Sequence, residues 1–253
     1  MSLSIQLGNF LYKHAFPVYN VIYPVFKKRQ DVTELALIKE FVKPGNNVLD
    51  IGANIGFYTN VFLKTVGKKG VVFAFEPEPI NFNYLRDNIK NQTNVILNSK
   101  AVSDVSGKLK IYLSKMLNVD HRTYPIDDYS EMKEIDAISI DDYLTQNGNP
   151  PIDFIKIDIQ GFEMSAFKGM ANTLKTNHNI KVISELWPYG LKKADSSATE
   201  MLQFLNGLDF NVYLLSESPF KILTDSTIHE LLVDENVYYN VFFTRDKIPT
   251  TIA

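Results

Sequence analysis

Residues 47–58 read NVLDIGANIGFY, and this stretch decides the fold class of the chain. The apolar run at 47–51 is typical of a buried strand, and residues from Phe57 onwards predict a helix. Between them lies a turn that contains Gly52 and Gly56. A strand that ends at such a turn leaves backbone N–H groups directed into a crevice, where parallel α/β sheets bind nucleotide-like ligands.

The glycine turn does not have the pattern of a pyrophosphate site. A dinucleotide site favours Gly-x-Gly-x-x-Gly, but Ala53 and Asn54 stand where the middle glycine would be. A Gly-Lys-Ser/Thr sequence, which would indicate a P-loop, is also missing. The ligand is therefore expected to present a group other than a pyrophosphate.

The strands and helices that follow predict a parallel, doubly wound sheet. Strands are expected at 71–75 and 95–97 with a helix between them, which completes a β-α-β-α-β unit. Further strands are expected at 153–159, 181–186, 210–215 and 237–244. The short separation of the last two favours antiparallel pairing. Residues 114–134 are polar and rich in Asp, and we expect them to form a long loop.

Length and composition limit the class of protein. The chain has 253 residues, 45% apolar content and a net charge of −3, which fits one large α/β domain or two small ones and does not indicate a nucleic-acid partner. It contains no cysteine, which excludes disulfides and thiolate chemistry and fits a reducing compartment. We see no secretory signal and no apolar run of about 18 residues, and expect a cytoplasmic location.

The N-terminal segment is rich in aromatic and apolar residues. Two prolines interrupt it, and Lys27, Lys28 and Arg29 follow. We expect residues 1–44 to form a helical cap on a domain that spans residues 45–253. A lid over the substrate, or peripheral contact with a membrane through residues 10–29, are the alternatives.

Four acidic residues are expected at or just after strand ends, namely Asp50, Glu76, Asp158 and Glu185. Glu76 lies 24 residues beyond Gly52, a spacing at which a carboxylate accepts hydrogen bonds from ribose hydroxyls. Its alternative role is to cap the next helix. Asp50 is expected to organise the turn or to meet a cationic part of the ligand.

The segment 153–163, DFIKIDIQGFE, is the second informative stretch. Lys156 and Asp158 share one face of its strand because side chains alternate. They form either a structural ion pair or, together with Glu185, a catalytic group that positions a hydroxyl and takes up its proton. Glu163 is either a first-turn acid or a substrate contact. His121 and Arg122, in the polar loop, are candidate substrate contacts.

These segments together resemble the FkbM family of S-adenosylmethionine-dependent methyltransferases. The matching segments are VLDIGANIGFYT at 48–59, FEPEP at 75–79, AVSD at 101–104, DFIKIDIQGFE at 153–163 and ISELWP at 183–188. The resemblance implies an α/β class I methyltransferase (Rossmann-like) fold, with a seven-stranded, mostly parallel sheet whose last strand is antiparallel and helices on both faces. It also implies methyl transfer to a hydroxyl of a small molecule such as a sugar or a secondary metabolite.

The resemblance also implies roles for individual residues. Asp50, Gly52, Asn54 and Gly56 would line the methionine end of S-adenosylmethionine, Glu76 would hold the ribose, and Ser103 and Asp104 would lie near the adenine. Relatives commonly carry Glu where this chain has Gln160, which weakens a mechanism that uses that acid as a base or a metal ligand. A divalent metal held by Asp158 and Glu185 is not favoured, because two carboxylates are few ligands.

Two other functions stay open at this point. A nicotinamide-dependent oxidoreductase would use the same fold class, but the missing middle glycine argues against it. A non-catalytic member that keeps the fold as a cofactor-binding scaffold is the second alternative, for which Gln160 leaves room.

Overall fold

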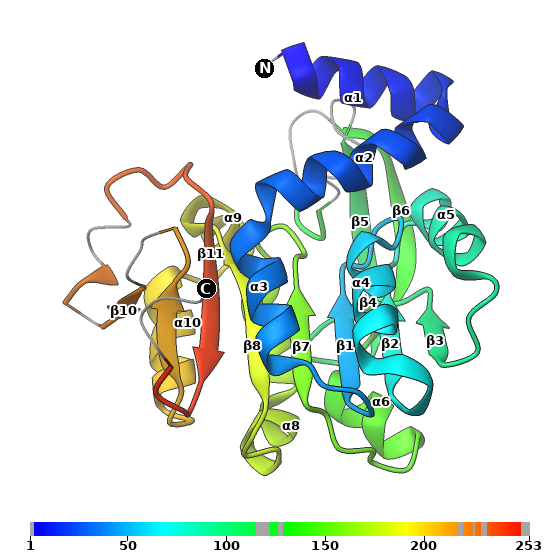
Figure 1. Ribbon diagram of the computed structural model, residues 1–253. Helices are drawn as coiled ribbons and strands as arrows, with labels where there is room; N and C mark the ends of the chain where they lie inside the picture. Colours follow the sequence, from blue (N-terminus) through cyan, green and yellow to red (C-terminus); the bar gives the residue numbers. More distant parts are fainter. Residues whose placement is uncertain are drawn as a thin grey trace.

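The computed structural model describes residues 3–114, 122–125, 129–216, 220–224, 226–228 and 232–248 (Figure 1). Its helices are α1 (Leu3–His14), α2 (Phe16–Gln30), α3 (Val32–Phe41), α4 (Phe57–Val66), the 3-10 helix η1 (Gly67–Lys69), α5 (Pro79–Ile89), α6 (Ile140–Gln146), α7 (Glu163–Gly169), α8 (Ala171–Thr176), α9 (Pro188–Lys193) and α10 (Ala198–Asn206). Its strands are β1 (Asn47–Ile51), β2 (Val71–Phe75), β3 (Val95–Asn98), β4 (Ala101–Val102), β5 (Gly107–Ser114), β6 (Tyr129–Ile138), β7 (Phe154–Ile157), β8 (Lys181–Leu186), β9 (Asn211–Leu214), β10 (Lys221–Leu223) and β11 (Tyr239–Thr244).

The main sheet has eight strands in the order β10-β9-β11-β8-β7-β1-β2-β3. Strand β1 pairs in parallel with β2 and β7, whereas β11 runs antiparallel to both β8 and β9. Without β10, this is the expected seven-stranded sheet with an antiparallel last strand. The eighth strand is a correction: β10 pairs antiparallel with β9 at the edge. It has only three residues, too few to show a hydrophobic period.

Helices cover both faces of the main sheet, as expected. One hydrophobic cluster joins strand side chains such as Leu49 to α6, α7 and α10, which contribute Ile140, Phe167 and Met201. The cluster on the other face joins the strands to α3, α4 and α5. Both clusters hold side chains that are fully buried, so the sheet lies between two apolar layers.

A separate three-stranded sheet has the order β4-β6-β5. Strands β5 and β6 pair antiparallel from Gly107 opposite Ala137 onwards. The prediction of a loop at 114–134 is therefore wrong for residues 129–134, which belong to β6. Most of these residues are exposed, so the segment has no apolar face that a sequence pattern could reveal. Residues 115–121 and 126–128 of that loop lie outside the described part of the chain.

The helices α1 and α2 lie across one end of the main sheet (Figure 1). They are fastened to α5 by hydrogen bonds, because Tyr12 Oη donates to Asn81 Oδ1 at 2.6 Å and Asn20 Nδ2 donates to Asn88 Oδ1 at 2.7 Å. Among the described residues, no helix combines the length and the apolar content needed to cross a bilayer. The helices α1 and α2 thus form a roof above the strand ends.

Candidate active site

A cavity of about 550 Å³ lies between α1, α2 and the carboxyl ends of β1, β2 and β7. Sites for small molecules typically measure about 300–1,000 Å³, so its size suits a cofactor with part of a second substrate. The described residues that line it from the sheet side include Gly52, Asn54, Tyr58, Glu76, Pro77, Lys100, Val102, Thr123, Lys156, Asp158, Gln160 and Glu185. From the roof, α1 contributes Leu7 and Leu11, and α2 contributes Tyr23, Phe26 and Lys27.

The turn after β1 requires glycine at one position for a steric reason. Gly52 has φ of 81°, and a Cβ there would lie 2.0 Å from the backbone oxygen of Asp158. Asn54 has φ of 52°, a left-handed conformation that asparagine tolerates better than most residues. Asn54 therefore has the backbone conformation of a tight turn, although it stands where a dinucleotide site would have its middle glycine.

Glu76 follows β2 and faces this turn. Its Oε2 accepts a hydrogen bond from the Asn54 N–H at 2.8 Å, and its Oε1 accepts one from the Glu78 N–H at 2.9 Å. A carboxylate has about four lone-pair sites, so two acceptor positions remain for hydroxyls in the cavity. The helix-cap alternative is not what the structure shows, since Glu78 caps α5 by accepting from the Asn81 N–H at 2.7 Å.

Burial controls the charge of Glu76. Only 6% of this residue is exposed, and burial raises the pKa of its carboxyl to about 8, although the two backbone hydrogen bonds act in the opposite direction. The carboxyl is therefore mostly protonated near neutral pH before a ligand binds. Hydroxyl groups that donate to it would favour its ionised form.

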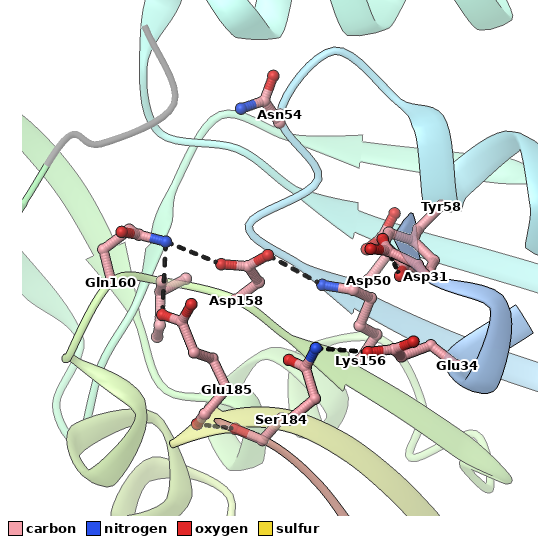
Figure 2. Close-up of polar contacts among 12 residues, drawn as sticks. Asp31, Glu34, Asp50, Asn54, Tyr58, Lys156, Asp158, Gln160, Ser184 and Glu185 are labelled. Atoms are coloured by element: carbon pink, nitrogen blue, oxygen red, sulfur yellow. Dashed lines mark hydrogen bonds and ion pairs between the residues drawn. The ribbon is translucent and has the colours of Figure 1, made fainter. Parts of the chain in front are cut away.

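Four side chains form a chain of hydrogen bonds at the ends of β7 and β8. Gln160 Nε2 lies 3.1 Å from Asp158 Oδ1 and 3.4 Å from Glu185 Oε2 (Figure 2). The other carboxylate oxygen of Asp158 lies 3.3 Å from Lys156 Nζ. Gln160 has φ of 57°, a conformation that is uncommon for residues other than glycine. The structure thus brings the three predicted catalytic residues together, with Gln160 as the link between Asp158 and Glu185.

Charges around Asp158 determine its protonation. Burial alone would raise the pKa of Asp158, but the cations of Lys156 and Lys27 and the hydrogen bond from Gln160 lower it below its usual range. The side chain is 38% exposed, and that surface opens into the cavity. Asp158 is consequently a carboxylate at neutral pH that a ligand in the cavity can reach.

Lys156 is held in its charged form. Burial favours the neutral amine, but the carboxylates of Asp158 and Asp50 outweigh this effect and raise the pKa of Lys156. Its Nζ also lies 4.4 Å from the centre of the Tyr58 ring, close enough for a cation–π contact. An ammonium group has no lone pair to accept a proton, so Lys156 acts on the site through its charge.

Asp50 and Gly56 lie outside the described lining of the cavity. Asp50 stands opposite Lys156 in the register of β1 and β7, is 1% exposed and accepts a hydrogen bond from Thr59 Oγ1 at 2.6 Å. Burial raises the pKa of Asp50 to about 6, against the opposing effects of Lys156 and Thr59. Gly56 precedes α4 with φ of 93°.

Three further predicted residues also lie outside the described lining of the cavity. Ser103 is fully buried and donates to Asp104 Oδ1 at 2.9 Å, and Ser165 donates to the same oxygen at 2.9 Å. Glu163 is fully buried, accepts from the Ile159 N–H at 3.1 Å and has its pKa raised to about 7, mainly by burial. The neighbouring Val102 does line the cavity.

The predicted contacts in the polar loop fall partly outside the described residues. His121 is one of the residues that the structure does not describe. The guanidinium of Arg122 lies 4.6 Å from the centre of the Trp187 ring, and Arg122 is not among the described lining residues. Its neighbour Thr123 lines the cavity, and Thr123 Oγ1 is buried with no hydrogen-bond partner among the described residues.

Two lining residues carry no signal in the sequence that would have revealed them. Tyr58 lies under Lys156 and donates through its hydroxyl to Asp31 Oδ2 at 2.6 Å (Figure 2). Lys27 reaches the same group of charges from α2, where it pairs with Asp31 at 2.5 Å. Both depend on the approach of segments that are distant in the sequence.

No group of three or more His, Cys, Asp and Glu side chains in the described part of the chain is arranged to hold a metal ion. Asp158 and Glu185 each accept a hydrogen bond from the Gln160 amide instead.

Residues 50–212 match the protein family described as "Methyltransferase FkbM domain". The chain is 28% identical over 148 residues to hexuronic acid methyltransferase AglP of Haloferax volcanii, over 58% of each chain. It is 27% identical over 147 residues to 2-O-methyltransferase NoeI of Sinorhizobium fredii, over 52% of this chain and 60% of the relative. The chain thus spans less than two thirds of either relative.

A solved structure supports the fold. The crystal structure of a putative rRNA-methylase from Clostridium thermocellum has a TM-score of 0.50 at 13% identity, and the match covers 83% of this chain and 92% of that one. The strand order, with β11 antiparallel between β8 and β9, is that of the class I methyltransferase fold.

Proposed function

Because this chain belongs to the family of the methyltransferase FkbM domain, we propose that it binds S-adenosylmethionine in the cavity and methylates a hydroxyl oxygen of a small molecule. The observation that carries this proposal is that Glu76 and Asp158 face one cavity from the ends of β2 and β7. The first carboxylate suits a ribose, and the second suits a hydroxyl that must lose its proton.

The residues on the β1 and β2 side fit the cofactor. Glu76 keeps two acceptor positions for neighbouring hydroxyls, and its own orientation is fixed by the Asn54 and Glu78 N–H groups. Gly52 and Asn54 line the cavity and are proposed to face the methionine end of the cofactor. Asp50 acts on the site indirectly, because its carboxylate raises the pKa of Lys156. We keep Ser103 and Asp104 as proposed residues near the adenine, because the neighbouring Val102 lines the cavity.

The residues on the β7 and β8 side suit the acceptor. The cofactor, when bound, supplies a methyl group on a sulfonium that is open to attack by oxygen. Asp158 would accept a hydrogen bond from the acceptor hydroxyl and take its proton as the carbon–oxygen bond forms and the methyl–sulfur bond breaks, which would leave S-adenosylhomocysteine as a neutral thioether. The hydroxyl proton becomes strongly acidic during that step, so a carboxylate of low pKa suffices as the base. Positioning of the two reactants contributes the larger share of the acceleration.

Neighbouring side chains assist Asp158 in this scheme. Lys156 keeps it ionised, and Gln160 holds it at a fixed angle beside Glu185. A metal ion between Asp158 and Glu185 is not part of the proposal, because the amide of Gln160 donates to both carboxylates. Thr123, with an unpartnered hydroxyl among the described residues, is a further candidate contact for the acceptor. Contacts of the acceptor with His121, Arg122 and Glu163 stay predictions from the sequence.

A sugar hydroxyl is the acceptor class that we favour. The names of two relatives refer to a hexuronic acid and to 2-O-methylation. The roof formed by α1 and α2 is proposed to act as a lid that excludes water, since Lys27 of α2 reaches the charges around Asp158. A cytoplasmic location remains a prediction from the sequence.

Transfer of a labelled methyl group from S-adenosylmethionine to a panel of sugars and uronic acids tests the proposal. We expect incorporation into at least one hydroxyl-bearing compound, with loss of incorporation in Asp158→Asn. Binding of S-adenosylhomocysteine without transfer to any acceptor would favour the scaffold alternative. Binding of NAD in place of S-adenosylhomocysteine would favour the oxidoreductase.

A further inference from the structure

The helix α2 exposes an apolar stripe on the outside of the molecule. Val18, Val21, Ile22, Val25 and Phe26 follow the spacing i, i+3, i+4, i+7 and i+8, which places them on one face of a helix. All five are exposed, Val21 to 72% and Phe26 to 52%. In a surface helix this stripe normally faces the core. Here the core side of α2 is supplied by other residues, such as the buried Tyr19.

The helix α1 extends this stripe. Leu7 and Phe10 are exposed to 56% and 58%, and α1 packs against α2. We call the seven residues Leu7, Phe10, Val18, Val21, Ile22, Val25 and Phe26 the outer face. Monomeric soluble proteins rarely expose contiguous apolar patches of this kind unless the patch binds a partner or a membrane.

The charge around the outer face is one-sided. Residues 1–30 contain four Lys or Arg residues and no Asp or Glu, although the whole chain has a net charge of −3. Lys28 and Arg29 are exposed at the end of α2, next to the apolar stripe. An exposed apolar face bordered by basic residues is typical of helices that lie in the interface of an anionic membrane.

We propose that the outer face docks on the surface of an anionic lipid bilayer. A second copy of the chain fits less well, because pairing of two outer faces would bring two positively charged segments together. Leu7, Ile22 and Phe26 belong both to the outer face and to the lining of the cavity. Docking would therefore bring the mouth of the cavity to the membrane surface. The docking itself does not depend on methyl transfer.

Sedimentation of the full chain with vesicles tests the docking. The vesicles contain phosphatidylcholine alone or phosphatidylcholine with phosphatidylglycerol. We expect binding to the anionic vesicles that weakens with added salt, and much weaker binding to the neutral ones. Equal binding to both vesicles, or binding to neither, would overturn the proposal.

Paired variants separate the apolar from the basic contribution. Val21→Gln with Val25→Gln should weaken vesicle binding about tenfold or more, whereas Val105→Gln with Val233→Gln, which replaces two exposed valines elsewhere, should not change it. Lys28→Gln with Arg29→Gln should weaken binding about fivefold for each charge removed. Its control is Lys68→Gln with Lys69→Gln in η1.

The same variants also show whether misfolding or self-association accounts for a loss of vesicle binding. Glutamine has a higher helix propensity than valine, so α2 should keep its helicity by circular dichroism and the variants should bind S-adenosylhomocysteine as the wild type does. Vesicle binding of the Val21/Val25 variant equal to that of the wild type would contradict the proposal. So would a lipid-free dimer in sedimentation velocity that the same two substitutions dissociate, because the outer face would then contact a second copy.

Discussion

The side-chain amide of Gln160 donates to Asp158 Oδ1 over 3.1 Å, on the side opposite the ion pair with Lys156. The second amide hydrogen is directed to Glu185, whose Oε2 lies 3.4 Å from the same nitrogen (Figure 2). An amide donates without titrating, so it links two carboxylates at every pH at which the protein is folded. This arrangement fixes Asp158 while leaving its charge intact.

Gln160→Glu should make the activity depend on pH. A third carboxyl beside Asp158 and Glu185 raises the pKa of the group, because like charges repel. At low pH a proton held among the three carboxyls replaces the amide donor. At high pH this proton is lost, and with it the donor. We expect the kcat of this variant, relative to wild type, to fall as the pH rises between about 6 and 9. The matched control is Gln203→Glu on the exposed side of α10, which should follow the wild-type pH profile. Identical profiles for Gln160→Glu and wild type would contradict the assigned role of Gln160.

Asp158→Asn should reduce kcat by about 10²- to 10⁴-fold, because the variant lacks the base that takes the hydroxyl proton. The affinity for S-adenosylhomocysteine should stay close to that of the wild type, since the proposed cofactor contacts lie on the β1 and β2 side. Glu185→Gln serves as the comparison and should lose less than about tenfold. Rate measurements with saturating acceptor distinguish the two, and a larger loss in Glu185→Gln would transfer the role of base to Glu185.

Binding of S-adenosylhomocysteine should release a proton from Glu76. The pKa of this carboxyl is raised to about 8 by burial, and ribose hydroxyls that donate to it favour the charged form. The affinity should therefore increase with pH up to about 8 and then level off, and the binding heat should depend on the ionisation enthalpy of the buffer. Calorimetry in two buffers at several pH values measures both.

Glu76→Gln should lower that affinity about 10- to 100-fold, because hydrogen bonds to a charged acceptor are lost, and should remove the proton release. Glu78→Gln is the matched control, since Glu78 is also buried and caps α5 rather than facing the cavity. A wild-type affinity that does not vary with pH would rule out the ionised ribose contact.

The ligand-free protein should become less stable as the pH rises from about 5 to 8. Burial is the main cause that raises the pKa of Asp50 to about 6, of Glu163 to about 7 and of Glu76 to about 8. In this window the folded state keeps protons that the unfolded chain has released, so the free energy of unfolding falls by about 1.4 kcal/mol per pH unit for each proton kept. Asp158, whose pKa is lowered, titrates at more acidic pH and does not contribute here.

Urea unfolding at a series of pH values measures this slope. Glu76→Gln should make the slope shallower between about pH 5 and 8, where the folded carboxyl would otherwise keep a proton that the unfolded chain has released. A stability that is constant or rises with pH across the window would show that the three carboxyls are not held neutral by burial.

The strands β1 and β2 could be predicted from the sequence to the residue. Both are short apolar runs that end at turn residues, and both are buried on two faces, which leaves a continuous hydrophobic signal. The strands β6 and β10 could not be predicted in this way. Most of the first half of β6 is exposed, and β10 has three residues, so neither shows a period.

The sequence indicates the position of several residues of the candidate site. Glu76, Asp158 and Glu185 follow from one rule, because carboxyl ends of parallel strands meet at one edge of the sheet. The same rule also selected Asp50, which the structure places outside the described lining of the cavity. Lys27 reaches the site because α2 packs across the sheet, and Tyr58 reaches it because α4 places its ring beside Lys156 of β7. No local pattern in the sequence encodes either approach.

Titration calorimetry of the wild-type chain with S-adenosylhomocysteine, and with NAD as the comparison, determines which cofactor the cavity binds. We expect saturable binding of one S-adenosylhomocysteine per chain and no heat with NAD. Binding of NAD with no binding of S-adenosylhomocysteine would contradict the assignment of the cavity to a methyl donor.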